Sequence, residues 1–314
     1  MRYYLKLPIA MLRFLKSYML PIAMCIGIVF YKFVTLFAGI TPFLIFAMLF
    51  ITYCKISFNE IRFEKFHFYL LAIQLLGSLA VYTLLYRVNP VVAQGSMICV
   101  LAPTATSAAV ITGMLGGSIA SLTAYSLLSN LCVAICAPII FSYIGGHSEM
   151  TFLQSFWFIL REVGPLLILP FVCATALDKI APRVRKKIQS LHNVSFYLWA
   201  MALTIVVGKT VSFILKQSSA SYTVEIGLAA CTFFICIGQF LVGRKIGKHY
   251  GQTVTGGQGL GQKNTVLTIW MALSYLDPIS SIGPGAYVLW QNVVNSYQLW
   301  LKQRKDAKHK NQEC

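Results

Sequence analysis

Two polar stretches stand out in this chain because their residue types could bind an ion or a small molecule. Residues 256–264, GGQGLGQKN, place two glutamines and one lysine among four glycines. Residues 102–107, APTATS, combine a proline with three hydroxyl side chains. Amide, hydroxyl and backbone carbonyl oxygens are the ligands that hard cations accept. The ammonium of Lys263 would repel a bound cation. It can instead take the place of a cation or pair with an anion.

Both stretches lie in a chain that is apolar along its whole length. Hydrophobic residues make up 57% of it and charged residues only 11%, whereas a soluble domain carries about 25% charged residues. Apolar runs recur, and many approach the roughly 20 residues that a spanning helix needs. Helix is the default in lipid, because backbone polar groups must be satisfied within the segment. The composition predicts an all-α polytopic protein of the inner or plasma membrane.

The apolar runs predict ten membrane-spanning helices, with an interfacial helix at 150–162 leading into the sixth. The expected spans are 18–38, 40–54, 67–86, 91–113, 119–143, 163–177, 193–214, 222–242, 254–276 and 284–301.

Lysine and arginine are distributed unevenly about these spans, and this sets the expected orientation. With the N-terminus in the cytoplasm, 20 of the 26 basic residues fall on the cytoplasmic side. They are Arg2, Lys6, Arg13, Lys16, Lys55, Arg62, Lys65, Lys179, Arg183, Arg185, Lys186, Lys187, Arg244, Lys245, Lys248, Lys302, Arg304, Lys305, Lys308 and Lys310. Both termini are therefore expected to be cytoplasmic. The net charge of +17 then reflects topology, and a nucleic-acid partner is not expected.

The fourth and ninth spans contain the two polar stretches and are poor helices. Glycine costs about 1 kcal/mol and proline about 3 kcal/mol inside a helix. We expect the spans to unwind at 103–107 and 257–263 and to cross near the membrane midplane. Each break is the fourth span of a set of five, so residues 1–148 and 149–314 would form two inverted repeats. Paired breaks in inverted halves are typical of a transporter's binding site.

At these residues the sequence resembles the bile acid:sodium symporter family. The resemblance covers nearly the whole chain and is strongest over 102–141 and 257–296. Family members carry a proline-led, Thr/Ser-rich break in span 4 and an E-x-G-x-Q-N signature in span 9. They also carry a polar pair in span 10, which in this chain becomes Gln291 and Asn292 after Trp290.

The resemblance implies a fold and a function. The fold has ten spans in two inverted repeats of five, with broken, crossing helices 4 and 9. Spans 1, 2, 6 and 7 form a panel, and spans 3–5 and 8–10 form a core. The implied function is secondary transport of a small organic anion by alternating access.

Several positions depart from the family's pattern. The acid, the glutamine and the asparagine of the signature fall on Gln258, Gln262 and Lys263. A polar Ser–Asn pair that binds the first sodium ion falls on Ala108 and Ala109.

Two further family positions lie in spans 3 and 5. One hydroxyl ligand falls on Leu122 while Ser126 is kept, and Gln74 corresponds to a glutamine of the second sodium site. Sodium needs several oxygen ligands, as other hard cations do, and alanine or leucine side chains supply none. A bound sodium ion therefore stays an open question, and no other cofactor or metal is expected.

Lys263 allows three interpretations, because a lysine within a membrane is costly and suggests a function. It could replace the lost sodium as a built-in cation. It could pair with an anionic substrate, helped by the positive end of a half-helix. It could instead extend its ammonium to water in a cavity.

The candidate substrate- or ion-binding residues surround the predicted crossing. They are Gln74, Pro103, Thr104, Thr106, Ser107, Thr112, Ser126, Asn130, Gln258, Gln262, Lys263, Asn264, Thr265, Gln291 and Asn292.

We therefore expect a transporter without strict sodium dependence, in which Lys263 takes the place of a bound cation. The alternatives are a sodium-coupled symporter with a rebuilt ion site and a membrane sensor that binds a ligand without moving it. An enzyme is not expected, because no nucleophile is paired with a base. The expected partners are an organic anion and the lipid bilayer, and the expected state is a monomer.

The orientation can be tested by cysteine labelling. A cysteine placed within 302–310 should react with a membrane-impermeant thiol reagent only after cells are permeabilised. His147→Cys, in a loop expected outside, is the control and should react in intact cells. Labelling of the 302–310 tail in intact cells would contradict the predicted topology.

Overall fold

The structure is a computed structural model of the chain and describes residues 19–56, 61–105, 107–145, 150–190, 194–216 and 222–313. Within these residues every regular element is a helix, and one isolated antiparallel β-bridge joins Thr104 to Lys263. The expectation of an all-α protein is confirmed for the described part of the chain.

Helices follow one another closely through both halves of the chain. The first half contains α2 (Met19–Val29), α3 (Tyr31–Val34), the 3₁₀ helix η1 (Thr35–Ile40), α4 (Thr41–Cys54), α5 (Lys65–Tyr86), α6 (Pro90–Leu101), α7 (Ala108–Met114) and α8 (Ile119–Ile144). The second half contains α9 (Phe152–Ile180), α10 (Pro182–Gln189), α11 (Val194–Lys216), α12 (Tyr222–His249), α13 (Thr253–Gly261), α14 (Thr265–Tyr275), η3 (Pro278–Ser281) and α15 (Ile282–Glu313).

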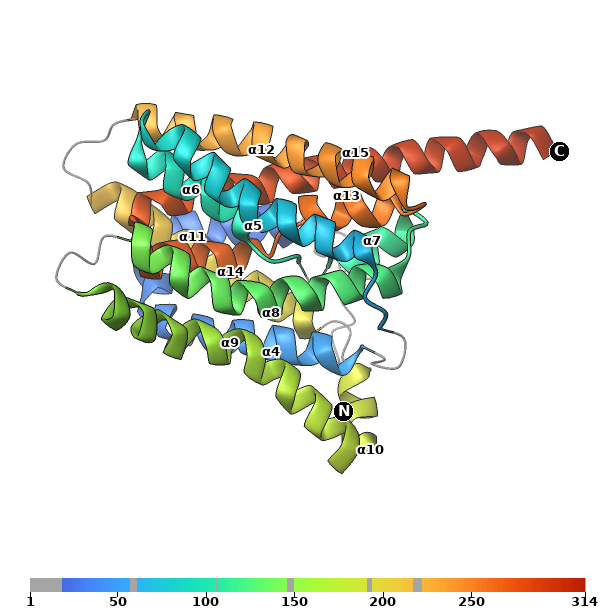
Figure 1. The fold of residues 1–314 in the computed structure, drawn as a ribbon, viewed down its shortest axis with the longest axis horizontal. Coiled ribbons are helices and arrows are strands. Elements are labelled where there is room, and N and C mark those ends of the chain that lie inside the picture. Colours follow the sequence, from blue (N-terminus) through green and yellow to red (C-terminus); the bar gives the residue numbers. More distant parts are fainter. Residues whose placement is uncertain are drawn as a thin grey trace, which may run out of the picture.

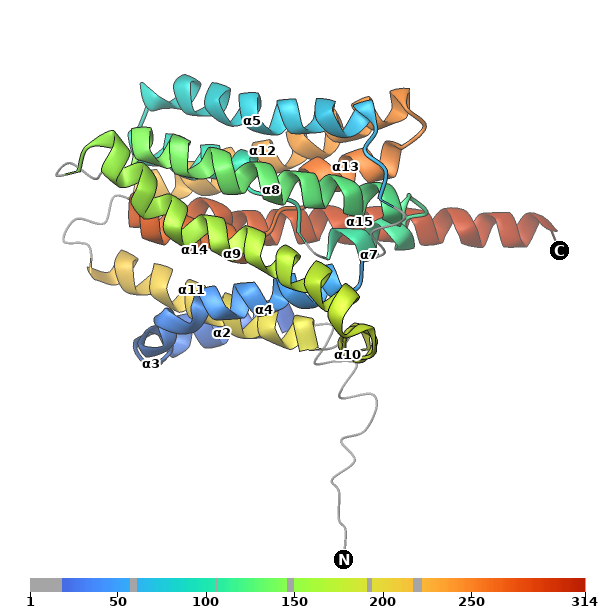
Figure 2. The same cartoon turned by 60° about the horizontal axis from the view of Figure 1, so that its bottom comes forward.

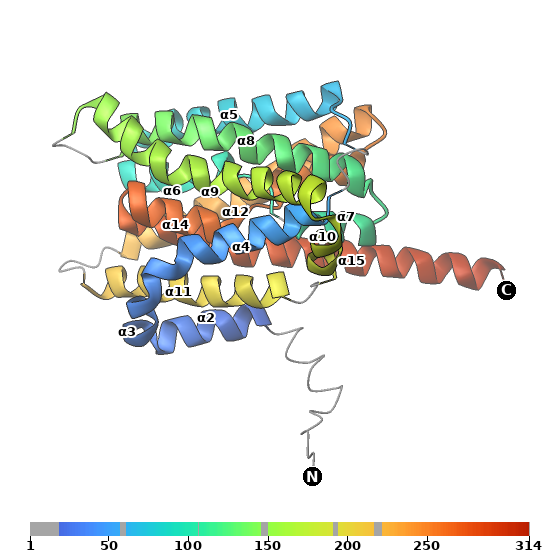
Figure 3. The ribbon, with the colours of Figure 1, turned by 90° about the horizontal axis from the view of Figure 1, so that it is seen from below.

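The long helices run side by side along one common direction (Figure 1). In Figure 2, α2, α4 and α11 lie together on one side of the molecule, and α5 and α12 lie on the other. Figure 3 shows the C-terminal part of α15 extending beyond one end of the bundle.

Several helices are long and apolar enough to cross a membrane. Six candidate spans are found among the described residues, and two shorter apolar helices are Pro90–Leu101 and Thr265–Tyr275. The six are Tyr31–Cys54, Lys65–Tyr86, Ile119–Ile144, Phe152–Ile180, Tyr197–Lys216 and Tyr222–His249. Large apolar side chains such as Leu36, Phe43 and Phe234 point outward and are more than two-thirds exposed. A surface of this kind is typical of contact with lipid, so the chain is a membrane protein.

Local sequence signals explain where several helices start. Asn89 caps α6 by accepting hydrogen bonds from the amides of Val91 and Val92, and Pro90 occupies the first turn. Ser118 caps α8 through the amide of Ser121. Such caps satisfy amides that have no partner within the helix.

The predicted interfacial stretch 150–162 and the predicted sixth span belong to one continuous helix. Thr151 and Gln154 form a capping box, and α9 then continues unbroken to Ile180 through two internal prolines. Its 29 residues span about 43 Å at 1.5 Å per residue, which exceeds the roughly 30 Å apolar thickness of a bilayer. One helix therefore provides both the predicted interfacial segment and the sixth span.

The first helix ends earlier than the predicted limit at residue 38, and its predicted start at residue 18 lies outside the described residues. Helix α2 ends at Val29, and the chain continues through α3 and η1 into α4. The 3₁₀ turns over 35–40 carry exposed apolar side chains, and the sequence pattern alone did not separate them from a spanning helix.

Both predicted helix breaks are present, but the second is smaller than expected. Helix α6 ends at Leu101 and α7 begins at Ala108, close to the predicted break at 103–107. Ala102 has φ −46° and ψ 137° and is non-helical, as expected for a residue that precedes a proline. Helix α13 runs through the glycine-rich stretch to Gly261, so the predicted unwinding of residues 257–261 is wrong. Only 262–264 are non-helical there.

The glycines of α13 allow close packing against α12, which explains why these residues are helical and not unwound. A Cβ atom on Gly256 would lie 2.2 Å from the carbonyl oxygen of Gly243 on α12, and a Cβ on Gly243 would lie 2.1 Å from that of Gly256. A Cβ on Gly261 would lie 2.4 Å from the ring of Phe240. Small residues allow membrane helices to approach this closely.

This packing predicts opposite effects for two substitutions on the same helix. Gly243→Ala should lower the thermal unfolding midpoint, because overpacking costs about 1–3 kcal/mol. Gly238→Ala is the matched control, since its Cβ would meet nothing within 4 Å. It should leave the midpoint unchanged or raise it slightly, because alanine favours helix by about 1 kcal/mol over glycine. Equal midpoints in detergent would contradict the close approach of α12 and α13.

Candidate functional site

The two helix breaks lie against each other and pair through their backbones. The amide of Asn264 donates to the carbonyl oxygen of Pro103 at 2.8 Å, and the amide of Ala105 donates to that of Gln262 at 2.9 Å. Thr104 and Lys263 thus form a one-residue antiparallel bridge. Each break supplies partners that the other needs, as non-helical backbone at membrane depth requires.

Lys263 places its side chain on the open carbonyl end of α6. Its Nζ donates to the carbonyl oxygens of Val100 and Ala102, both at 2.9 Å. The last carbonyls of a helix lack intrahelical partners and carry the negative end of the helix dipole, which favours a cation. Lys263 is only 1% exposed, so this geometry does not fit a lysine that extends its ammonium to water.

Gln74 on α5 supplies further hydrogen-bond donors to the carbonyls at the end of α6. Its Nε2 donates to the carbonyl oxygens of Leu101 and Ala102 at 2.7 and 3.0 Å. Its Oε1 accepts from the hydroxyls of Tyr125 at 2.7 Å and Ser129 at 2.9 Å. Tyr125 and Ser129 were missed by the sequence analysis, although their spacing of four residues on α8 places both on one helix face.

Gln291 on α15 supports the backbone of Lys263. Its Oε1 accepts from the Lys263 amide at 2.8 Å, and its Nε2 donates to the Lys263 carbonyl at 3.3 Å. The side-chain amide of Gln291 thus makes the two backbone hydrogen bonds that a neighbouring strand would make with Lys263. Gln291 therefore contacts the second break, whereas Asn292 donates to the carbonyl oxygen of Val288 within its own helix.

The carbonyls at the end of α13 are covered in the same way as those of α6. Thr104 Oγ1 donates to the carbonyl oxygen of Gly259 at 2.8 Å, and the hydroxyl of Tyr287 donates to that of Gly261 at 2.8 Å. Tyr287 is not among the predicted residues, because an aromatic residue in an apolar helix carries no polar signal in the sequence.

A chain of amide groups leads away from the breaks along α13 and α15. Gln262 donates to Ser107 at 3.0 Å and accepts from Asn295 at 2.9 Å. Gln258 donates to Asn295 at 2.9 Å and to Gln298 at 3.3 Å, while its Oε1 is buried without a hydrogen-bond partner in the described structure. Asn295 and Gln298 were not predicted, yet with Gln291 they occupy one face of α15 at helical spacing.

The remaining predicted residues take structural or separate positions. Asn264 accepts from the amide of Leu267 and caps α14, and Thr265 begins that helix. Asn130 donates to the Ser126 carbonyl within α8. Thr112 is buried on α7, and its hydroxyl has no partner among the described residues. Thr106 lies outside the described residues.

No group of three or more His, Cys, Asp or Glu side chains that could hold a metal ion occurs among the residues described. The oxygens gathered at the breaks are backbone carbonyls, amides and hydroxyls, and most of them already accept a hydrogen bond. Among them, the carbonyl oxygens of Val100 and Ala102 accept from the ammonium of Lys263.

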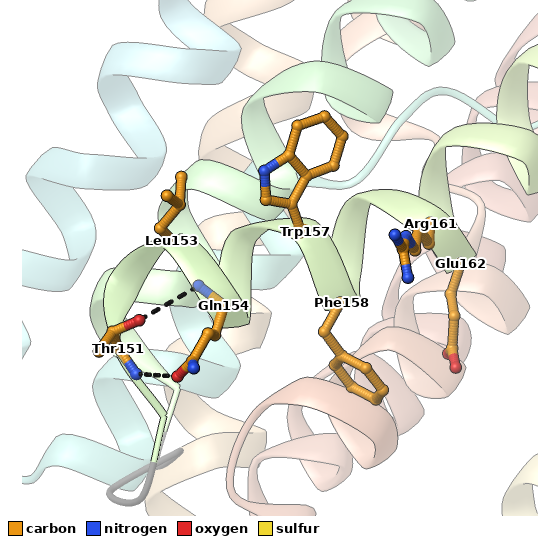
Figure 4. Close-up of a pocket in the computed structure, with 7 residues that line it drawn as sticks. All are labelled: Thr151, Leu153, Gln154, Trp157, Phe158, Arg161 and Glu162. Carbon is orange, nitrogen blue, oxygen red and sulfur yellow. Dashed lines mark hydrogen bonds between the residues drawn. The ribbon is translucent and has the colours of Figure 1, made fainter.

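A surface depression of about 780 Å³ lies elsewhere, along the first turns of α9. Figure 4 shows Trp157, Phe158, Arg161 and Glu162 on this single helix. Its lining contains none of the residues at the breaks, so it is separate from the candidate site.

Removing the ammonium of Lys263 should destabilise the protein. Lys263→Met keeps an unbranched side chain but removes two charge-assisted hydrogen bonds, each of which contributes about 1.5–3 kcal/mol. We expect a clear fall in the thermal unfolding midpoint in detergent. The control is Lys209→Met on α11, a half-buried lysine away from the breaks, which should lower the midpoint less. Equal falls would contradict a special role of Lys263 in closing the carbonyl end of α6.

Comparison with protein-family models finds no match to this chain, and a search of curated proteins finds none either. Membership of the bile acid:sodium symporter family therefore stays a prediction from the sequence.

Proposed function

We propose that this protein is a secondary transporter that moves a small organic anion across the membrane by alternating access. We further propose that it belongs with the bile acid:sodium symporter family and works without strict sodium dependence. In this proposal the ammonium of Lys263 takes the place of a bound cation.

One observation carries the proposal. The ammonium of Lys263 lies at 2.9 Å from two carbonyl oxygens at the end of a broken helix, where a transporter of this kind would coordinate a cation. Unwound carbonyls and half-helix C-terminal ends are the groups that hold coupling cations in such proteins. A tethered cation there favours replacement of the ion over a lysine that faces an anionic substrate.

The residues present do not fit a sodium ion in addition to Lys263. Ala108, Ala109 and Leu122 offer no side-chain oxygen where the family has polar ligands. A sodium ion about 5 Å from the ammonium would experience roughly 3 kcal/mol of repulsion at an effective dielectric of about 20. The unpaired Oε1 of Gln258 supplies one acceptor, and hard cations need about six.

The order of the helices supports the inverted-repeat architecture. With α6–α7 and α13–α14 each counted as one broken span, each break is the fourth span in its half of the chain. The proposed panel then consists of α2, α4, α9 and α11, and the proposed core contains the remaining long helices. Rocking of these two bodies about the paired breaks is the proposed motion.

The proposed orientation places both termini in the cytoplasm. Basic residues cluster at the end of the bundle where α4 and α12 finish, and α10 and the tail of α15 lie at the same end (Figure 1). This end would face the cytoplasm by the positive-inside rule.

Uptake into proteoliposomes tests the proposal. Organic anions that raise the thermal midpoint of the purified full-length protein would first be selected as substrates. Labelled substrate should then accumulate equally with sodium or with choline outside. Lys263→Ala should reduce uptake at least about tenfold, which corresponds to about 1.4 kcal/mol, and the comparison uses protein that elutes as a single folded species.

Three outcomes would contradict parts of this proposal. Strict sodium dependence of the wild type would reject the built-in cation and favour a sodium-coupled symporter. Unimpaired uptake by Lys263→Ala would show that the ammonium has no role in transport. Ligand binding without any uptake would favour a sensor over a transporter.

A further inference from the structure

Helix α10 lies across the end of the bundle rather than along it. The chain turns at Ala181, whose backbone is non-helical with φ −142° and ψ 67°, and Pro182 begins α10. Figure 2 shows α10 nearly end-on, whereas the long helices run horizontally in the same view. If the long helices cross the bilayer, α10 lies roughly parallel to its surface.

The inner face of α10 is fixed to the end of α4. Arg185 Nε donates to the carbonyl oxygen of Cys54 at 3.0 Å, and Gln189 Nε2 donates to the same oxygen at 2.8 Å. The guanidinium of Arg185 also bonds the carbonyl of Ile56 and the carboxylate of Asp178. These contacts cap the last carbonyls of α4 and determine which face of α10 points outward.

The outward face of α10 is basic. Lys186 and Lys187 follow Arg183 by three and four residues, so all three share one face of the helix. They are exposed, and none takes part in an ion pair in the portion of the chain that the structure describes. The nearest acid in the sequence, Asp178, pairs with Arg185.

Apolar side chains accompany these charges at the same level of the molecule. Ile180, at the end of α9, is 82% exposed, and Val184 on α10 is 49% exposed. A short helix that presents both apolar and basic side chains at a membrane surface is suited to the boundary between acyl chains and headgroups.

We propose that the basic face of α10, formed by Arg183, Lys186 and Lys187, binds the phosphate groups of anionic phospholipids in the adjacent leaflet. The charges are complementary, and a guanidinium matches phosphate geometry in a bidentate manner. The exposed Ile180 and Val184 favour a lipid over an acidic soluble protein, because a lipid brings acyl chains to the same place. Since α10 is fixed to α4, bound lipid would hold this pair of helices at the headgroup level.

This inference does not depend on transport activity. It concerns only which lipids contact α10. The lipid proposal can therefore fail while the proposed transport function holds, and the transport function can fail while the lipid proposal holds.

Spin-labelled lipids provide the test. The full chain is reconstituted in phosphatidylcholine vesicles that contain either spin-labelled phosphatidylglycerol or spin-labelled phosphatidylcholine. Electron paramagnetic resonance then measures the motionally restricted fraction of each lipid. The wild type should prefer phosphatidylglycerol, and high salt should weaken this preference. In the triple variant Arg183→Gln/Lys186→Gln/Lys187→Gln the preference for phosphatidylglycerol should fall by about fivefold or more, since each basic residue near an anionic surface contributes about that factor.

A matched control removes the same charge elsewhere. Lys305→Gln/Lys308→Gln/Lys310→Gln changes the part of α15 that extends beyond the bundle (Figure 3) and should keep the wild-type preference. Equal restriction of the two lipids by the wild type would overturn the proposal. An equal loss of preference in both triple variants would also overturn it, because the effect would then follow net charge and not α10.

Discussion

The Lys263 ammonium donates hydrogen bonds to the carbonyl oxygens of Val100 and Ala102 at the end of α6. Without these donors the carbonyl groups would destabilise the fold, because they lie in apolar surroundings. A buried carbonyl without a donor costs about 1–3 kcal/mol, and the break after α6 frees several of them. Gln74 covers the same end from a second helix. The site therefore consists of backbone carbonyls that would normally be hydrogen-bonded within a membrane helix. Side chains from other helices supply their hydrogen-bond donors.

Among the described residues, a second basic side chain covers the carbonyls at a helix end in the same way. Arg185 covers the carbonyls of Cys54 and Ile56 at the end of α4, as Lys263 covers those at the end of α6. In both cases a cation lies at the negative end of a helix dipole. The difference is burial. Lys263 is enclosed at the paired breaks, whereas Arg185 lies on a helix whose other face is open and basic.

Close packing of α12 against α13 sets the position of the second break. The glycine pair formed by Gly243 and Gly256 lets two backbones touch, and the bridge between Thr104 and Lys263 then lies directly beyond the end of α13. A side chain larger than hydrogen at either glycine would push the helices apart. The glycine-rich stretch thus combines a packed helix with a short break, and its composition alone suggested only the break.

From the sequence alone one could predict the apolar, all-helical character of the chain, the two interrupted helices and the isolation of Lys263 within one of them. These follow from local quantities, namely hydropathy, proline and glycine content, and the absence of nearby acids. The three-dimensional fold was needed to show that Lys263 contacts Val100 and Ala102, because those residues are more than 160 positions away. It also decided that Tyr125 and Tyr287 serve as hydroxyl donors and that the glycines of α13 pack instead of unwinding. Side-chain partners depend on which helices lie side by side, and hydropathy contains no information about that choice.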